Sequence, residues 1–558
     1  EILRCLVGSE MCIRDSQKIP ALLPKYIDVE RERKQGFDME LYIKPVSEIY
    51  TQSTEVKRMV VIMSVLAFAL LFVAAMNYIL NSVSSLPIRA RSVGVHKCNG
   101  ASSKDIFNMF LFETAALFVV ALVCMALLLF AFREYVADMV AVPTLGTLLN
   151  AQTIWLPAIM ILAIFILSAL LPARLFSVIP VTQVFRVSTS GKQGWKRSLL
   201  FIQFGGIAFV ITLLVIVLLQ YDRLMNNDLG YDPENIVYAP LNNMDDQKAA
   251  KLTAEFKKLP YVTATGLSSM DILSGYGGFP ILDNEKNWLF TARQVNYDAD
   301  YLSLMKIPLL EGQPLKGDGD ILVNESFVSK RGWTDAAIGK YIYDDEGNLK
   351  GKIVGVTRDF MVNSFFTPQL PVIMFGSDRM SYCNFTVRVS ELTPEYLREM
   401  NDKIAELFPN EDVGFTVLKT IIESQYEGTR HFRDGVFVAS IAILLITLMG
   451  LLGYITDEMH RRSKEIAIRK VNGATAPNIL RLLSKDVLIT AFPAILLGVI
   501  ASRVVGESWL RQFADKIPLT VFIFISTALL VLAIIWGCVI LKSWNIANEN
   551  PVRSIKNE

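Results

Sequence analysis

The side chains best suited to binding chemistry in this chain belong to a short basic stretch that occurs twice. One copy is Ile88–Ser102 (IRARSVGVHKCNGAS) and the other is Arg461–Thr475 (RRSKEIAIRKVNGAT), 373 residues further on. Each copy follows an apolar segment, and at the same offset Asp486 falls on Glu113 in the next apolar segment. Chance similarity rarely keeps its register into a neighbouring helix, so the sequence indicates that a whole module is duplicated.

The second copy has the spacing of a short charged helix. Glu465, Arg469 and Lys470 fall on one helical face or its edge. The Asn472-Gly473 pair that follows is typical of a helix end, because glycine tolerates the left-handed backbone found there. We therefore expect a helix, a turn and a second helix between two apolar segments.

The second helix has its own start signals. Thr475 is a candidate N-cap, and Pro477 falls in the first helical turn, where proline is tolerated. Two interpretations of the basic element stay open: an interfacial helix that only orients the chain in a membrane, or a shaped docking surface. Repetition of glycine and alanine as well as charge favours the docking surface.

Catalytic groups are few. The chain has three histidines, and His96 and His460 lie in basic segments while His431 borders an apolar one. A Ser-His-Asp triad or a multi-histidine metal site is therefore hard to build. No G-x-x-x-x-G-K-[ST] sequence is present, which leaves the chain without a P-loop of its own for ATP hydrolysis.

Carboxylates remain as candidates in the long segment 220–435. Composition does not exclude a two-carboxylate glycosidase, but loop acids are mostly solvated turns, and the Gly-rich turn Gly275–Gly278 lacks a phosphate-binding context. The acids considered are Asp232, Asp245, Asp246, Glu325, Asp344 and Asp345. We expect no catalytic activity from this chain.

The composition is that of a membrane protein. Hydrophobic residues make up 52% of the 558 residues, more than in an ordinary soluble domain. Crossing the hydrocarbon core takes about 20 mostly apolar residues in a helix. We expect seven transmembrane helices, at Met59–Leu80, Phe110–Phe132, Ile154–Leu171, Leu199–Leu219, Val436–Ile455, Val487–Val505 and Thr520–Leu541.

Basic residues in the short loops predict the orientation, because Lys and Arg accumulate on the cytoplasmic side. Four segments hold nineteen Lys and Arg, whereas two alternate segments hold three. The basic segments are 81–109, 172–198, 456–486 and 542–558, and the others are 133–153 and 506–519. The basic set is expected in the cytoplasm, which places residues 1–58 and 220–435 outside.

The long outer segment alternates β-branched runs with amphipathic helical patterns. Strands are expected at Ile236–Leu241, Val262–Leu267, Ile321–Asn324, Lys352–Val356, Val372–Phe375, Phe385–Val389 and Gly414–Leu418, and helices at Gln247–Leu259, Pro394–Phe408 and Thr420–Arg433, the last running into the helix at Val436. This predicts an α/β or α+β domain of βαβ-like units. Its one cysteine, Cys383, allows no internal disulfide.

The first sixteen residues, EILRCLVGSEMCIRDS, fit neither module. They begin without Met and lack both a signal peptide's apolar run and helical periodicity. The second module has a helix and a large outer domain before its three helices, whereas the first has only a short outer segment. We therefore expect residues 1–16 to be non-native and the sequence to be an N-terminally truncated fragment.

The segment EIAIRKVNGA, from Glu465 to Ala474, matches E-[IV]-[AG]-[IV]-R-K-x-x-G-A, the hallmark of the FtsX/MacB-type permease family of ABC transporters. The segment from Gln203, QFGGIAFVITLLVIVLLQYDRLMNNDLGYDPENIVYAPL, also resembles the entry to a MacB-like extracytoplasmic domain, as do VNESFVSKRGW and GKIVGVTRDF. The resemblance covers nearly everything after residue 17. It implies an α-helical transmembrane bundle with an α/β extracytoplasmic domain of MacB-like periplasmic type.

The resemblance divides the chain into six parts. These are a non-native segment 1–16, a remnant of a first extracytoplasmic domain 17–58, a first permease module 59–186 with coupling loop 81–109, a linker and fourth transmembrane helix 187–220, the MacB-like domain 221–435, and a second permease module 436–558 with coupling loop 456–486.

In this family the cytoplasmic loop after the second helix of a module seats on an ATPase subunit. Carried over, that coupling role falls on Glu465, Arg469, Lys470 and Gly473 in the second copy and on Arg91, Lys97 and Gly100 in the first. The first copy departs from the pattern, with Ser92 in place of the glutamate and His96 in place of the arginine. A weaker grip on the ATPase, or a regulatory role, is implied for it.

The resemblance implies a multi-pass permease subunit of the bacterial inner membrane. It would transmit ATP-driven motion of a separate ATPase dimer to extracytoplasmic domains, for export or extraction of a substrate that the sequence does not name. No cofactor is expected in the chain, because ATP would bind the partner ATPase. Membrane lipids and a periplasmic or outer-membrane protein are expected partners, and nucleic acid is not. Two alternatives stay open: regulation of a cell-wall hydrolase, and a membrane sensor without ATPase coupling.

Overall fold

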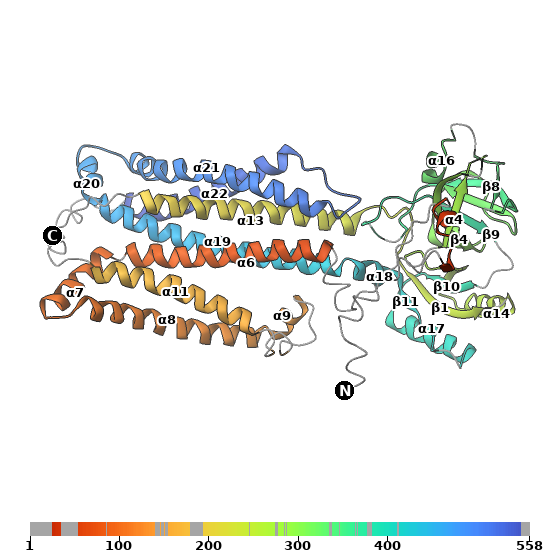
Figure 1. The fold of residues 1–558 in the computed structure, drawn as a ribbon, viewed down its shortest axis with the longest axis horizontal. Helices are drawn as coiled ribbons and strands as arrows, with labels where there is room; N and C mark the ends of the chain where they lie inside the picture. Colours follow the sequence, from red (N-terminus) through yellow and green to blue (C-terminus); the bar gives the residue numbers. More distant parts are fainter. Residues whose placement is uncertain are drawn as a thin grey trace. The chain divides into compact units, whose positions relative to one another are not determined.

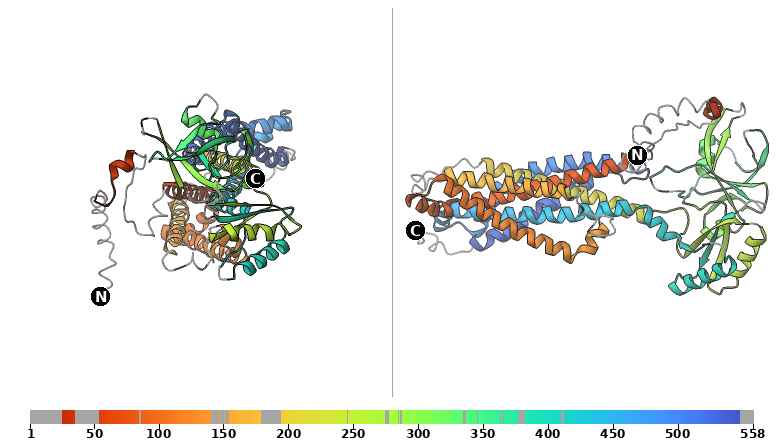
Figure 2. Two further views of the ribbon diagram at one scale, coloured as in Figure 1. Left: turned by 90° about the vertical axis from the view of Figure 1, so that its right-hand side faces the viewer. Right: turned by 60° about the horizontal axis from the view of Figure 1, so that its bottom comes forward.

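The chain forms two compact units in a computed structural model (Figures 1 and 2). The model describes residues 25–34, 54–84, 86–139, 146, 150, 154–178 and 194–547, with short gaps at 245, 274–276, 284, 286, 334–336, 345, 363, 365, 377–381 and 410–411. The helical unit comprises Lys57–Asp222, Gly428–Arg511 and Ile517–Glu558, and the sheet unit comprises Glu1–Val56, Arg223–Glu427 and Gln512–Lys516.

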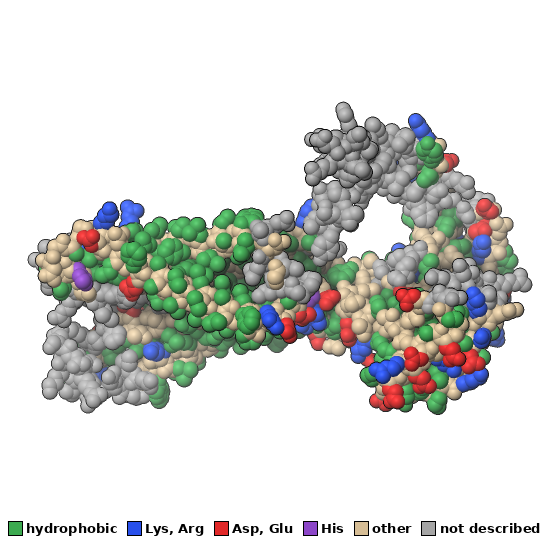
Figure 3. All heavy atoms as spheres, turned by 90° about the horizontal axis from the view of Figure 1, so that it is seen from below, with side chains coloured by type: hydrophobic (Ala, Val, Ile, Leu, Met, Phe, Trp, Pro, Cys, Tyr) green, Lys and Arg blue, Asp and Glu red, His purple; other side chains and the backbone are tan. Residues whose placement is uncertain are grey.

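Among its described residues, the helical unit contains seven helices long and apolar enough to cross a membrane, which confirms the prediction. They are α6 (Thr54–Ser84), α8 (Ser103–Ala131), α11 (Trp155–Val178), α13 (Gly194–Asn226), α19 (Glu427–Arg461), α21 (Ala476–Leu510) and α22 (Val521–Ala547). Shorter helices are α7 (Leu86–Cys98), α9 (Arg133–Met139) and α20 (Ser463–Val471). The surface of this unit is largely hydrophobic (Figure 3), as a lipid-facing bundle requires.

The duplication is visible in the helix boundaries. The first residues of α6 and α19 are 54 and 427, which differ by 373. The last residues of α7 and α20, 98 and 471, and the first residues of α8 and α21, 103 and 476, differ by the same number. Among the described helices, α13 alone of the long ones has no counterpart at this offset.

Helices α6 and α19 meet at equivalent positions. Asn77 of α6 donates from Nδ2 to the carbonyl oxygen of Ile446 in α19 at 2.7 Å. The counterpart of Asn77 at the 373-residue offset is Gly450, and a Cβ there would lie 2.6 Å from Asn77 Oδ1. The two helices therefore cross about a local two-fold axis. At this crossing one copy carries the side-chain amide of Asn77, and the other has Gly450, where the contact leaves no room for a side chain.

Helix α13 is the most deeply embedded of the seven spans, with more than half of its apolar window buried. Its Gly205 lies against α21, where a Cβ on Gly498 would come within 2.2 Å of the Gly205 carbonyl oxygen. Membrane helices approach this closely only where side chains are small. Small residues on both helices thus explain how α13 fits into the bundle.

The sheet unit contains an eleven-stranded mixed sheet, in the order β11-β1-β10-β2-β4-β9-β6-β8-β5 with β3 on β4 and β7 on β8. The strands are β1 (Ile236–Met244), β2 (Val262–Ser268), β3 (Gly277–Leu282), β4 (Trp288–Tyr297), β5 (Leu309–Gly312), β6 (Asp320–Asn324), β7 (Tyr341–Tyr343), β8 (Leu349–Thr357), β9 (Val372–Gly376), β10 (Tyr382–Val389) and β11 (Thr416–Val417). The helices are α4 (Val29–Lys34), α14 (Asp246–Phe256), α15 (Tyr301–Met305), α16 (Glu325–Arg331), α17 (Pro394–Leu407) and α18 (Leu418–Gln425). The predicted α/β domain is confirmed.

Two lobes share this sheet. In the first lobe, β1-α14-β2 and β10-α17-β11 are each βαβ units whose strands are separated by a strand of the other unit, the order of a ferredoxin-like split βαβ fold. Its core includes Phe256, Phe385 and Leu252, all buried. The second lobe, β3 to β9, is inserted between β2 and β10. Within the sheet it is linked to the first lobe through the residue pair Ser268 and Tyr297.

Several elements of the second lobe escaped the sequence patterns. Strands β3, β4, β5 and β7 and helices α15 and α16 have no predicted counterpart. Strand β3 contains two glycines and a proline, which read as a turn, and β5 and β7 are only 4 and 3 residues long. Short or glycine-containing strands carry too little alternation to be recognised.

The predicted helix Thr420–Arg433 is interrupted. Helix α18 ends at Gln425 and α19 begins at Glu427, with Tyr426 between them outside helical geometry. The Tyr426 side chain is 1% exposed, and its hydroxyl contacts the Met361 sulfur at 3.7 Å. The helix is therefore interrupted at a residue whose ring is buried in the sheet unit.

Residues Gln512–Lys516 of the loop between α21 and α22 belong to the sheet unit, which the sequence patterns did not indicate. Asp515 accepts hydrogen bonds from Arg223 Nη2 at 2.7 Å and from Asn227 Nδ2 at 2.5 Å. Phe513 stacks on Phe366 with ring centroids 5.1 Å apart. Five residues distant in sequence thus complete this unit.

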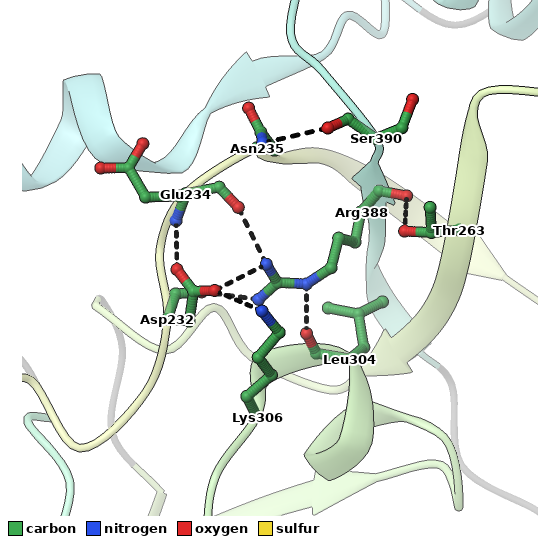
Figure 4. A network of polar contacts seen from close by, with 8 residues as sticks. All are labelled: Asp232, Glu234, Asn235, Thr263, Leu304, Lys306, Arg388 and Ser390. Carbon is green, nitrogen blue, oxygen red and sulfur yellow. Dashed lines mark hydrogen bonds and ion pairs between the residues drawn. The ribbon is translucent and has the colours of Figure 1, made fainter.

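A half-buried arginine ties the segment that contains α15 to the first lobe (Figure 4). Arg388 of β10 donates from Nε to the Leu304 carbonyl at 2.7 Å and from Nη2 to the Asp232 carbonyl at 2.7 Å. The Asp232 carboxylate lies 3.1 Å from Arg388 Nη1 and 2.7 Å from Lys306 Nζ. This network fixes α15 and the segment that precedes β1 against the sheet.

Candidate functional site

The two basic stretches fold into the same helix-turn-helix element. Helices α7 and α20 lie at the same end of the helical unit (Figure 1). In the first copy the Gly100 amide donates to the Lys97 carbonyl and the Ala101 amide to the His96 carbonyl; in the second, Gly473 donates to Lys470 and Ala474 to Arg469. Each pair of bonds is a Schellman motif, which closes a helix end.

The glycine at each turn is required by the backbone. Gly100 and Gly473 have φ angles of +93° and +89°, and no atom lies within 4 Å of where a Cβ would stand. The left-handed conformation, and not lack of space, therefore selects glycine. The predicted helix end at Asn472-Gly473 is confirmed.

The next helix starts differently in the two copies. Ser102 caps α8 with a capping box, accepting from the Asp105 amide while the Asp105 carboxylate accepts from the Ser102 amide at 2.9 Å. Thr475 is the N-cap of α21 and Pro477 lies in the first turn, as predicted, but the Thr475 side chain makes no capping bond. The first copy therefore has the better-satisfied helix start.

The structure brings together part of the predicted set of charged residues. Glu465 and Arg469 pair with each other along α20 at 2.8 Å, and both are exposed. Lys470 is half-buried. In the first copy Lys97 donates from Nζ to the Ser177 carbonyl at 2.8 Å, whereas the side chain of Arg91 lies outside the described residues.

Exposed apolar side chains lie beside these charges, and sequence reasoning assigned them no role. Ile468 is 62% exposed and Val471 is 68% exposed, while Ile466 on the same helix is buried. Val95, the counterpart of Ile468, is 53% exposed. The sequence shows two isoleucines two residues apart, but only the helix phase reveals which of them faces outward.

A charged cluster fixes the start of α20 to three other helices. Arg462, the residue before α20, pairs through Nε with Glu458 of α19 and through Nη2 with Asp486 of α21 at 2.5 Å. Arg197 of α13 lies 3.5 Å from the same Asp486 carboxylate. Burial by itself would lower the pKa of Arg462, but the charges of Glu458 and Asp486 raise it above its ordinary value.

Asp486 thus pairs with Arg462 and Arg197 and does not simply sit at the membrane interface. Glu113, its counterpart in α8, is exposed. The two modules therefore share the acidic position, and in the second it anchors the charged cluster.

The carboxylates of the sheet unit have structural partners. Asp232 belongs to the Arg388 network, Glu325 accepts from the Asp359 amide at 3.1 Å, and Asp344 accepts from the Asn348 amide at 2.7 Å. These are turn and network contacts of the kind expected for loop acids. Asp245 and Asp345, and the Asp246 side chain, lie outside the described residues.

Comparisons with known proteins address the duplicated helices directly. The family model described as FtsX-like permease C-terminal matches the chain twice, at residues 64–181 and 437–551. The first match contains α7 and the second contains α20. The chain carries a duplicated FtsX-like permease module. The FtsX-like segments follow the duplication seen in the helix boundaries, and they leave the sheet unit between them.

Two solved structures that are similar to this FtsX-like protein cover about a third of its length. The periplasmic region of MacB from Actinobacillus actinomycetemcomitans is 13% identical, covers 36% of the chain and 97% of its own, and has a TM-score of 0.27. The extracellular domain of the ABC-type transporter YknZ from Gram-positive bacteria is 11% identical, covers 33% and 99%, and has a TM-score of 0.25. No curated protein matches significantly. Assignment to the family therefore rests on the two permease segments.

Proposed function

We propose that this FtsX-like protein is the permease subunit of an ABC-type transporter, transmitting the ATP-driven motion of a separate ATPase dimer to its outer sheet unit. The observation that supports this most is the duplicated element: both modules present a short helix closed by the same hydrogen bonds. Two equivalent elements suit a two-fold partner. ATP would bind the partner, since the chain lacks a P-loop.

The exposed face of α20 supports docking on a protein. Ile468 and Val471 stand out beside the Glu465–Arg469 pair. Burying one such side chain contributes about 1.5–3 kcal/mol, whereas an exposed ion pair contributes little. The apolar side chains would supply the affinity for the partner, and the charged pair beside them would fix the position in which it docks.

The charged cluster supplies a path for transmission. A displacement of α20 pulls on Arg462, which is bonded to α19 through Glu458 and to α21 through Asp486. Both long helices continue to the other end of the helical unit, so a movement at one end reaches the other. We propose that this movement drives the export or extraction of a substrate at the bacterial inner membrane.

The test is reconstitution of the protein in lipid nanodiscs with a candidate ABC-type ATPase, measuring co-purification and ATP turnover. Stimulation of turnover by the unsubstituted protein, and its loss on Ile468→Asp, is the expected result. Orientation is tested by impermeant thiol labelling of a cysteine at Thr475 in a cysteine-free background. Labelling from outside intact cells, or the absence of any ATPase association, would contradict the proposal.

A further inference from the structure

Helices α6 and α19 contact each other at two levels, and the two contacts share an asymmetry. At one level the Asn77 carboxamide of α6 fills the space in front of Gly450 of α19. Nearer the first residues of both helices, Met63 of α6 lies in front of Gly435 of α19, where a Cβ would stand 2.3 Å from the Met63 methyl carbon. In each contact the first module supplies the larger side chain and the second module supplies a glycine.

The Asn77 contact is the stricter of the two. Asn77 is 7% exposed, and its Nδ2 donates to the Ile446 carbonyl at 2.7 Å. This bond holds the carboxamide in place, because swinging it away from Gly450 would break the bond where no water can replace it. The Met63 methyl group ends a flexible side chain that can move aside, so Gly435 is less tightly required.

We infer that Asn77 and Gly450 decide which modules pair, so that the first module of a chain packs on the second module of the same chain and not on a module of a second copy. The choice arises because α6 and α19 are equivalent at the 373-residue offset, and the backbone alone does not distinguish α6–α19 from α6–α6 or α19–α19. Specificity is the difference in free energy between right and wrong pairs. A single buried asparagine has this role in coiled coils, where it specifies register and oligomer state.

Each wrong pair lacks a feature of the right one. In an α6–α6 crossing of this geometry a second Asn77 would replace Gly450, and its Cβ would fall 2.6 Å from the first carboxamide oxygen. In an α19–α19 crossing two glycines would face each other, with no side-chain hydrogen bond and with the space of the carboxamide unfilled. The α6–α19 pair combines close packing with the bond, and packing and hydrogen bonds are what hold membrane helices together.

The two-fold relation predicts that the asparagine and the glycine can exchange places. The counterpart of Ile446 at the offset is Val73, one helical turn before Asn77. With glycine at position 77, an asparagine at position 450 is therefore placed to donate to the Val73 carbonyl. The Gln203 carboxamide oxygen of α13 stands 3.4 Å from the Gly450 Cβ position, and this flexible side chain can shift to admit the new residue.

Complementation between two full-length copies with different affinity tags tests this partner choice. One copy carries Gly450→Asn, which places an asparagine in both modules, and the other carries Asn77→Gly, which places a glycine in both. Neither copy can form the asparagine–glycine pair within itself, but two such pairs form if the copies exchange modules. After co-expression in bacterial membranes and extraction in mild detergent, these copies should capture each other at least about fivefold more than two unsubstituted copies do.

Matched pairings give the controls. Two Gly450→Asn copies, or two Asn77→Gly copies, should capture each other less than half as well as the mixed pair. An unsubstituted copy and a copy of the double variant Asn77→Gly/Gly450→Asn should stay at background, because each forms its pair within the chain, where covalent linkage raises the local concentration of the right partner. Thr447→Val, a buried change one turn from Gly450, should leave capture unchanged.

Thermal unfolding in detergent gives the second arm. The double variant should unfold at a higher temperature than Gly450→Asn alone, because the exchange restores the contact. Three results would overturn the inference: a mixed pair that captures no better than the like pairs, unsubstituted copies that capture equally well, or a double variant no more stable than Gly450→Asn. If Gly450→Asn alone does not fold, its recovery from membranes on co-expression with Asn77→Gly is the readout, and no recovery counts against the inference.

Discussion

The two helix-turn-helix elements of this FtsX-like protein share a backbone and differ in the side chains that they present. Their closing hydrogen bonds coincide bond for bond, and the glycine φ angles differ by only a few degrees. Along the exposed surface, Glu465 and Arg469 form an ion pair in the second element, whereas Ser92 and His96 occupy those positions in the first. The shape of the element has been kept while its charge has diverged.

This difference separates two models of docking. If the shape and the apolar side chain at its centre decide binding, both elements hold the partner about equally. If the ion pair decides, the second element dominates. Because Val95 and Ile468 are both exposed and apolar, the two models predict different results for the same substitutions.

The largest effect is expected at the apolar position. Ile468→Asp removes an apolar contact of about 1.5–3 kcal/mol and places a charge in the interface, so association with the ATPase should fall roughly a hundredfold. Val95→Asp should have a similar effect if shape decides. Co-purification and ATP turnover in nanodiscs measure both. Asn478→Asp is the matched control for added charge, because Asn478 is exposed in the first turn of α21. If Asn478→Asp weakens ATPase association as much as Ile468→Asp does, the apolar contact has no special role.

The ion pair should rank second and should break the equivalence of the two elements. Truncating one partner of a charged contact that becomes buried in an interface costs about 2–5 kcal/mol. Glu465→Ala or Arg469→Ala should therefore weaken ATPase association roughly thirtyfold, the lower end of this range, and Ser92→Ala or His96→Ala only a fewfold.

The Glu507–Arg511 pair provides the control for these four variants. It has the same i,i+4 spacing, at the other end of α21. Glu507→Ala should leave association unchanged. If the variants in the two elements reduce association to the same extent, the charge asymmetry is irrelevant to docking.

Much of this architecture was predictable because its signals are local or repeated. Seven apolar stretches gave the seven spans, and the Asn472-Gly473 and Thr475-Pro477 pairs gave the turn. The first lobe was recognised because β1, α14 and β2 have long, regular patterns. Such signals depend only on neighbouring residues.

The remainder depends on contacts between residues that are distant in sequence. Attachment of Asp515 to Arg223 cannot be inferred from a short polar loop. Exposure of Ile468 rather than Ile466 depends on the phase of a nine-residue helix. The cluster around Arg462 joins the start of α20 to three other helices, so its members become visible together only once the bundle is assembled.

The turn glycines should behave alike in both elements, which tests whether the backbone is shared. A left-handed residue other than glycine costs about 1–2 kcal/mol, so Gly473→Ala and Gly100→Ala should each lower the melting temperature by a similar amount. Circular dichroism of the protein in detergent measures this. Gly537→Ala, in a helix interior with open space around it, should instead be neutral or stabilising. Unequal losses at the two turns would show that the elements differ in backbone strain.

The smallest expected effect concerns the helix starts, where the first element is the better stabilised. Ser102→Ala removes a capping box and should cost about 1 kcal/mol. Thr475→Ala removes a side chain that makes no capping bond, so its cost should stay within a few tenths of a kcal/mol. Thermal unfolding compares the two, and amide hydrogen exchange in the first turns of α8 and α21 locates the effect. Docking is proposed to displace α20. Because the start of α21 lacks a side-chain cap, the second element can move more easily than the first. Equal losses from the two substitutions would contradict that asymmetry and leave charge as the difference between the elements.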